Sequence, residues 1–308
     1  HKHGGPTYTA GTMEDGRDYL IEKGAAACAL EKEAFDYDAR IVAMDSQGID
    51  IGIVSLTSPN VYWGGEEVSC ETARLANNEM AAGEAAFPDR IRWLASLPFE
   101  YPDKAIIELN RAIENGAVGV MATASINGKH LIDPLFEPVW AEINKLALPV
   151  LIHPTAPFGS KEAEFGIERI LMPGAGFMFD TTIGIARMAV DGFFENFPDL
   201  KIIASHGGGY IPYVNGRIDM FYQLETLNKL KIDKLPSEYF SRIYYDAVLY
   251  DPGALALCID IAGPEKVLFG TDFPMPCDIP KLYEMIETRP TEEIKAIKGG
   301  NAIKLFGL

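Results

Sequence analysis

Four of the five histidines in this 308-residue chain occupy positions where an imidazole could bind a metal ion or move a proton. The first two form the pair HKH, and the i,i+2 spacing of His1 and His3 turns both rings to one face if the segment is a strand. His153 ends the apolar run LPVLIHP, and His206 follows the apolar run KIIAS. The fifth, His130 in SINGKH, is interpreted as loop surface. The pattern therefore points to chemistry at the ends of strands.

An aspartate, Asp272, ends the last apolar run, in KVLFGTDF. Imidazole nitrogens and carboxylate oxygens form a typical ligand set for a divalent metal ion. The predicted ligands of one ion, with zinc preferred and manganese as the alternative, are His1, His3, His153 and Asp272. A second ion would usually need a bridging lysine or carboxylate after the strand GVMATAS, which offers neither. His206 then remains as a neighbour that could move protons, and His206 and Asp272 are the predicted catalytic residues.

Each of these positions also has a simpler interpretation. The HKH pair at a chain terminus could be the remnant of a purification tag. A single histidine or aspartate at the end of a strand is more often a hydrogen-bonded structural residue than a ligand. The glycines that follow His206, in HGGG, allow a sharp turn in either case. The conjunction of all these residues favours the metal site.

Unbroken apolar runs, rather than alternating ones, predict strands that are buried on both faces. The predicted strands are residues 49–56, 91–99, 117–124, 148–154, 201–207, 243–249 and 266–273. Amphipathic stretches between them predict helices at residues 65–87, 101–116, 133–147 and 180–197, with one or two short helices in residues 290–308. The third and fourth of these helices open at Asp133 and Asp180, which could cap them.

Seven strand–helix units without a linker or repeat predict one α/β domain over residues 1–308. A doubly wound sheet and a (β/α)₈ barrel both fit this order. The barrel is favoured because an eighth strand would fall just before residue 1. In a parallel barrel the carboxyl ends of all the strands surround one opening, so the separate histidines and the aspartate would meet there.

Composition narrows the possible partners. A net charge of −17 and a pI near 4.7 argue against nucleic acid, because a polyanion would be repelled. No basic cluster suggests an anionic membrane surface, and no apolar run of 18 residues or basic leader suggests a membrane span or signal peptide. The four cysteines are scattered, which is typical of reduced residues in a cytoplasmic protein.

Longer motifs resemble a known family. The run HGGGYIPYVNGR, followed later by GTDFP, is similar to the decarboxylase branch of the amidohydrolase superfamily. The stretches FDYDARIVAMDSQGID, LIHP and FSRIYYDAVLYDP extend the similarity over most of the chain. The chain most resembles the aminocarboxymuconate-semialdehyde decarboxylases and, more distantly, the γ-resorcylate decarboxylases.

This resemblance implies a distorted (β/α)₈ barrel whose metal site, at the carboxyl ends of the strands, keeps a water in its open position. It implies that His206 is the acid/base beside that water. Arg217 matches an arginine that reaches the substrate carboxylate in the neighbouring subunit, so the resemblance also implies a homodimer.

The implied activity is non-oxidative decarboxylation of a small unsaturated or aromatic carboxylic acid, which makes the protein a carbon–carbon lyase. The alternative is a hydrolase or hydratase that uses the same site on a lactone, an amide or an unsaturated acid. A non-catalytic scaffold is disfavoured because His153, His206 and Asp272 are all intact. The segment before Arg40 lacks the arginine of the muconate-semialdehyde enzymes, and residues 170–180 lack their tryptophan. Both departures argue against that particular substrate.

Overall fold

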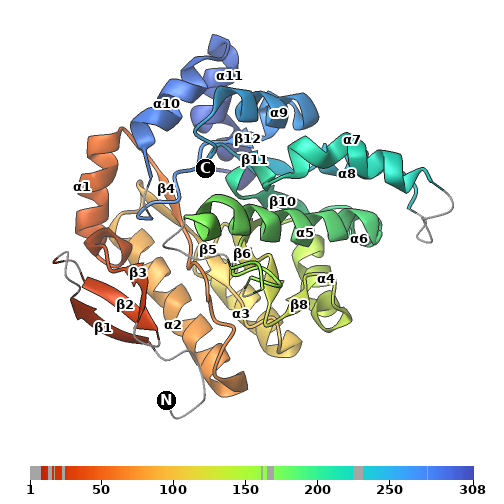
Figure 1. Cartoon of the computed structure of the whole chain (residues 1–308). Helices are drawn as coiled ribbons and strands as arrows, with labels where there is room; N and C mark the ends of the chain where they lie inside the picture. The colour runs from red at the N-terminus through yellow and green to blue at the C-terminus, as the bar shows by residue number, and fades with distance from the viewer. Residues whose placement is uncertain are drawn as a thin grey trace.

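Seven parallel strands form a curled sheet that carries the rest of the molecule (Figure 1). Their order across the sheet is β12-β11-β10-β9-β6-β5-β4. The strands are β4 (Gly52–Val54), β5 (Ile91–Ser96), β6 (Gly119–Thr123), β9 (Pro149–His153), β10 (Lys201–Ala204), β11 (Tyr244–Asp246) and β12 (Val267–Leu268). All seven lie within the predicted ranges. The architecture is the distorted (β/α)₈ barrel expected from the sequence.

The structure is a computed structural model, and it describes residues 8–12, 16, 18–22, 25–160, 162–164, 170–224, 232–275 and 277–308. The predicted ligands His1 and His3 lie outside the described residues.

Helices cover the sheet (Figure 1). They are α1 (Tyr37–Gln47), α2 (Gly65–Ala86), α3 (Pro102–Glu114), α4 (Glu137–Lys145), α5 (Phe177–Val190), α6 (Phe193–Asn196), α7 (Ile211–Tyr222), α8 (Pro236–Phe240), α9 (Pro252–Ala262), α10 (Ile279–Glu287), α11 (Thr291–Lys295) and α12 (Asn301–Phe306). The described residues also contain short 3₁₀ turns at η1 (Lys32–Ala34), η2 (Pro134–Phe136), η5 (His206–Gly208) and η6 (Pro264–Lys266) and π turns at η4 (Met172–Gly176) and η7 (Ala296–Gly300). No helix in the described ranges is both long and apolar enough to cross a membrane.

Two apolar clusters lie on opposite faces of the sheet, because successive strand residues point to opposite sides. The larger cluster joins Val150, Ile152 and Ile202 to the covering helices. The smaller cluster joins Ile203 to Leu305 of α12 and to partly buried Leu151 and Tyr244. The position two residues beyond Leu151 on β9 shares this face, and it is His153.

The predicted helix over residues 180–197 is wrong in its limits. α5 begins at Phe177, and Gly192, with φ 76°, separates it from α6. Asp180 is therefore not a cap but lies in the first turn of α5, where its carboxylate accepts a hydrogen bond from the Thr155 backbone, 2.9 Å away. Asp133 does cap η2, since its carboxylate accepts from the Leu135 N–H at 3.0 Å.

Several elements were not predicted. Strands β1 (Tyr8–Thr12), β2 (Asp18–Glu22) and β3 (Ala25–Ala29) form a separate antiparallel sheet at the lower left of Figure 1. Strands β7 (Ser125–Ile126) and β8 (Lys129–His130) form a small hairpin. His130 is thus a half-buried strand residue whose ring lies 4.9 Å from the Phe158 ring, and its interpretation as loop surface is wrong.

Candidate metal and active site

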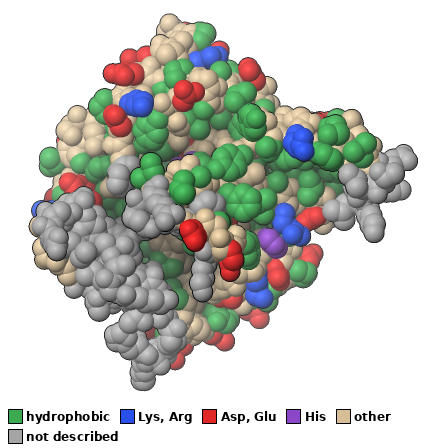
Figure 2. All heavy atoms as spheres, viewed as in Figure 1, with side chains coloured by type: hydrophobic (Ala, Val, Ile, Leu, Met, Phe, Trp, Pro, Cys, Tyr) green, Lys and Arg blue, Asp and Glu red, His purple; other side chains and the backbone are tan. Residues whose placement is uncertain are grey.

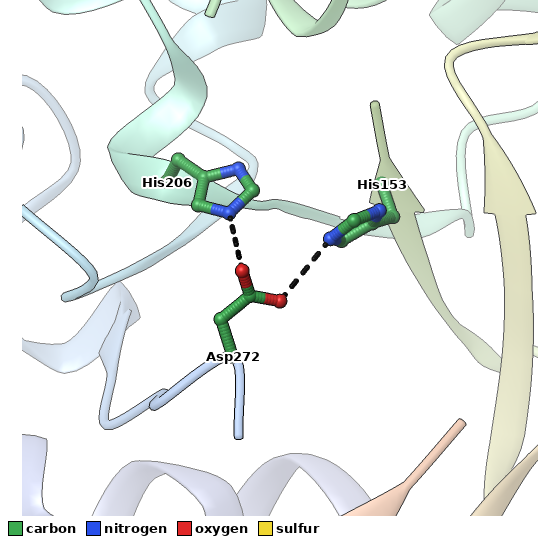
Figure 3. Close-up of side chains that lie close together, drawn as sticks. All are labelled: His153, His206 and Asp272. Carbon is green, nitrogen blue, oxygen red and sulfur yellow. Dashed lines mark hydrogen bonds and ion pairs between the residues drawn. The ribbon is translucent and has the colours of Figure 1, made fainter. Parts of the chain in front are cut away.

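Three side chains from separate strand ends meet at the opening of the barrel (Figure 3). Asp272 stands between the two histidines. Its Oδ1 lies 3.4 Å from His153 Nε2, and its Oδ2 lies 3.5 Å from His206 Nε2. The two imidazole rings lie 5.3 Å apart, centroid to centroid. His153 and Asp272 are 119 positions apart in sequence. They come into contact because the curl of the sheet brings their strand ends together.

His153 presents its Nε2 atom to the centre of the group. It is the last residue of β9, and its Nδ1 lies 3.1 Å from the Pro154 carbonyl oxygen. A carbonyl oxygen can only accept a hydrogen bond, so this contact places a proton on Nδ1 and leaves Nε2 to face Asp272. Nε2 is then the nitrogen that can bind a metal ion, in a ring oriented by a contact behind it.

His206 lies two residues past β10, in a left-handed backbone conformation with φ 52°. The glycines after it continue the turn, and Gly209 shows why a side chain is excluded there. A Cβ on Gly209 would lie 2.2 Å from the Met178 carbonyl oxygen of α5. The turn therefore packs directly on α5 and keeps His206 only 8% exposed.

Electrostatics keep Asp272 ionised. Partial burial alone would raise the pKa of its carboxyl group, but the contacts with His153 and His206 outweigh burial and hold that pKa well below its ordinary value. For His206, burial would lower the pKa, yet Asp272 and the nearby Asp246 outweigh it and raise the pKa above its ordinary value. The site thus combines a permanent carboxylate with an imidazole that readily holds a proton.

Helix α5 accepts hydrogen bonds from the two loops that follow His153 and His206. Asp180 accepts a hydrogen bond from the backbone of Thr155, two residues after His153. Thr182 Oγ1 accepts one from the Tyr210 N–H at 2.7 Å, four residues after His206. Burial raises the pKa of Asp180 to about 6, although the Thr155 contact and His153 oppose the rise. One helix therefore sets the spacing of both rings.

The donor atoms fit a divalent cation. Two imidazole nitrogens and a carboxylate oxygen lie within 4.8 Å of one another. Ligands about 2.1 Å from one ion in tetrahedral positions lie roughly 3.4 Å apart. The contacts of 3.4 and 3.5 Å match that spacing and exceed the length of a strong hydrogen bond. His153 and Asp272 are thus suited to hold a divalent ion, and His206 lies close enough to contact a molecule bound to that ion.

A cavity of about 350 Å³ is lined in part by the loop that follows Asp272. Its lining includes Glu31 and Glu33 from the N-terminal part of the chain, together with Phe273 and Met275. Two acidic side chains in the wall disfavour an anionic substrate. None of the three site residues lines this cavity.

Arg217 does not join the group. It lies on the exposed part of α7, with its guanidinium carbon 4.8 Å from the centroid of the Phe221 ring. Among the residues that the structure describes, no carboxylate forms an ion pair with it.

Two acidic residues near the site were not singled out from the sequence. Asp180 was interpreted as a helix cap. Asp246 ends β11, in YYDAVL, and the reasoning that selected Asp272 at the end of its apolar run applies to Asp246 equally.

Comparison with known proteins gives consistent results. A model of the family described as amidohydrolase matches residues 18–308. A 2-amino-3-carboxymuconate-6-semialdehyde decarboxylase from Dictyostelium discoideum is 30% identical over 91% of this chain and 79% of its own length. A gamma-resorcylate decarboxylase from a Polaromonas species is 31% identical over 88% and 87%. The crystal structure of a dihydroxybenzoic acid decarboxylase from Polaromonas, with bound manganese and the inhibitor 2-nitroresorcinol, superimposes with a TM-score of 0.78 at 28% identity, covering 88% of this chain and 86% of its own.

Proposed function

The chain belongs to the amidohydrolase family, and we infer that it is a metal-dependent, non-oxidative decarboxylase of a small aromatic or unsaturated carboxylic acid. The observation that carries this function is the meeting of His153, His206 and Asp272 at the carboxyl ends of the barrel strands. In a parallel barrel this is the face at which active sites form.

We propose that one divalent ion is bound by His153 and Asp272 together with His1 and His3. The Nε2 atom of His153, which faces Asp272, and the ionised carboxylate of Asp272 support their part in this set. Zinc suits a ligand set rich in imidazole, and the manganese in the Polaromonas relative supports manganese as the alternative. When bound, the ion would hold and polarise the oxygens of the substrate.

The proposed reaction begins with proton transfer from His206 to the carbon that bears the carboxylate. The bond between that carbon and the carboxyl carbon then breaks, its electron pair restores the π system, and carbon dioxide leaves. Water returns the proton to His206. The raised pKa of His206 supports this role, because it increases the fraction of rings that carry a proton to donate. Asp272 keeps its negative charge throughout and orients both histidines.

We propose that the protein acts as a homodimer and that Arg217 holds the substrate carboxylate in the neighbouring subunit. Figure 2 shows hydrophobic side chains gathered over α5 and α7. The exposed apolar residues of these two helices and the turn before α7 are Phe179, Tyr210, Tyr213, Met220 and Phe221. A face of this kind supports contact between two protein surfaces. A guanidinium within it could hold a carboxylate through two parallel hydrogen bonds.

Two broader features are also proposed. The chain is a single domain, because one continuous strand order accounts for the whole sheet. The protein works in a reducing compartment such as the cytoplasm, an assignment supported by the free thiols of Cys70, Cys258 and Cys277.

The decisive experiment incubates the purified, metal-loaded protein with a panel of hydroxybenzoic, vanillic and muconate-type acids and measures the release of carbon dioxide. Release that depends on the metal supports the lyase. Lactones or amides consumed without gas would instead identify a hydrolase on the same site. The panel must include dihydroxybenzoates, because a decarboxylase acting on that class of acid superimposes on this chain.

A further inference from the structure

The backbone at His206 adopts a conformation that its own sequence disfavours. Its φ of 52° lies in the left-handed region, where a Cβ meets the following carbonyl oxygen. Gly207 continues in the same region at 60° without that penalty. A non-glycine residue stays in this region only where its surroundings determine it. A specific contact must therefore hold the turn that aims the imidazole.

That contact is made by Asp246, the last residue of β11. Its Oδ1 accepts hydrogen bonds from the backbone N–H groups of Gly207 and Val248, each at 3.1 Å. The backbone N–H of His206 also interacts with this carboxyl group. Successive N–H groups in a left-handed turn converge on one point, which makes such a turn a natural cradle for a carboxylate.

The neighbouring strand end leaves room for this carboxylate. A Cβ on Gly270, just past β12, would lie 3.2 Å from Asp246 Cβ and 3.2 Å from Val248 Cγ2. Asp246 is thus enclosed between the His206 turn on one side and the Gly270 segment on the other. Its position leaves little freedom for the carboxylate to move away from the turn.

We propose that Asp246 is a positioning residue for proton transfer, which holds the left-handed turn at His206 and thereby aims the imidazole at the substrate. This role rests on the proposed decarboxylase function. Asp246 does not belong to the His153–His206–Asp272 group, so it acts through the backbone of the turn and not as a ligand.

The test compares Asp246→Ala and Asp246→Asn with the wild type, in kcat, KM and bound metal. Asp251→Ala is the matched control, because Asp251 also accepts a backbone N–H, that of Ala254 at 2.9 Å, but at the exposed start of α9. We expect Asp246→Ala to lower kcat by roughly 10- to 100-fold. KM and metal content should stay near the wild-type values. The asparagine variant keeps one acceptor oxygen, so its kcat should fall less than that of Asp246→Ala. Asp251→Ala should have the kcat of the wild type.

A double-mutant cycle separates positioning from general destabilisation. If Asp246 acts through His206, Asp246→Ala should lower kcat no further in a His206→Ala background. An equal fold loss in both backgrounds, or a full kcat in the single variant, would overturn the proposal.

A crystal structure of Asp246→Ala gives a readout that needs no substrate, and Asp246→Leu, which has a side chain of similar size but no acceptor oxygen, serves if the alanine variant does not fold. The proposal requires the His206 turn to shift from the conformation seen in the wild type. An unchanged turn and ring orientation would contradict it. If the wild-type protein decarboxylates no acid in the panel, the proposed function fails, and this structural result still decides the role of Asp246.

Discussion

The side chains of His206 and Asp272 face each other at 3.5 Å, and both residues hold a left-handed backbone, with φ of 52° and 57°. Each such residue costs about 1–2 kcal/mol relative to an ordinary conformation. Neither is a glycine, so the surrounding contacts must offset this cost. Strain of this kind concentrates at functional sites, where it fixes side chains in orientations that a relaxed backbone would not give.

Loss of the His153 side chain should remove most of the bound metal. In His153→Ala the cation loses a nitrogen ligand that a carbonyl contact has already oriented, so the metal per protomer should fall well below the wild-type value. Elemental analysis after gel filtration measures it. His130→Ala removes a histidine outside the group and should keep its metal. Full occupancy in His153→Ala would remove His153 from the ligand set.

Loss of the His206 side chain should separate metal binding from turnover. We expect His206→Ala to retain its metal while kcat falls by roughly 10²- to 10⁴-fold, the usual contribution of a positioned acid or base. Steady-state kinetics and elemental analysis on the same preparation test both parts. Undiminished turnover would end the proton-transfer role, and loss of the metal would instead make His206 a ligand.

Arg217→Ala should weaken substrate binding more than turnover. In the proposed role the guanidinium would hold the substrate carboxylate before and during the reaction, so its removal should raise KM by at least about 10-fold with a smaller effect on kcat. Arg217→Lys keeps the positive charge but cannot form two parallel hydrogen bonds, so its KM should lie between those of the wild type and Arg217→Ala. An unchanged KM in the alanine variant would count against the contact.

Mixed dimers show which subunit Arg217 serves. If it acts across the interface, a dimer of one Arg217→Ala and one His206→Ala subunit contains one intact site. Co-refolding equal amounts should then restore about a quarter of the wild-type kcat/KM, measured at substrate concentrations well below KM, because half of the dimers are mixed and each has one working site. If Arg217 acts within its own subunit, no dimer contains an intact site and the mixture stays as weak as its parents.

Asp180 should make the stability of the protein depend on pH. Burial raises its pKa from 3.8 to about 6, and a rise of this size corresponds to roughly 3 kcal/mol. Because the folded-state pKa is raised, this destabilisation is fully present above pH 6 and is relieved as the pH falls towards the unfolded-state value.

Asp180→Asn should therefore gain stability relative to the wild type at pH 7.5, and the gain should shrink by about half at pH 5. Urea unfolding at both pH values measures the difference. If the difference in unfolding free energy between Asp180→Asn and the wild type were the same at both pH values, the charge on the Asp180 carboxylate would not destabilise the folded protein.

The strands could be predicted from sequence because burial on both faces leaves an unbroken apolar run. Their ends could not, since the runs continue into turns. His206 and Asp272 belong to the predicted strands but lie two and four residues beyond the observed ends of β10 and β12. The β1–β3 sheet was missed because segments such as AAACA carry neither a strong apolar run nor a regular alternation.

The candidate site was partly predictable for a related reason. His153 and Asp272 each close an apolar run, and a barrel brings such positions together. Asp180 and Asp246 act through backbone groups of other elements, and sequence alone does not show which N–H group a carboxylate will meet. A capping pattern at Asp180 thus suggested the wrong partner, while the same pattern at Asp133 suggested a correct one.

The central claim is that distant strand ends hold one catalytic cation between them. Anomalous diffraction from crystals of the purified protein, collected on both sides of the zinc and manganese absorption edges, tests it most directly. The account predicts one strong peak bonded to His153 Nε2 and to an Asp272 carboxylate oxygen, with His206 beside it. A metal-replete crystal with no peak there, or with its peak elsewhere on the protein, would contradict it.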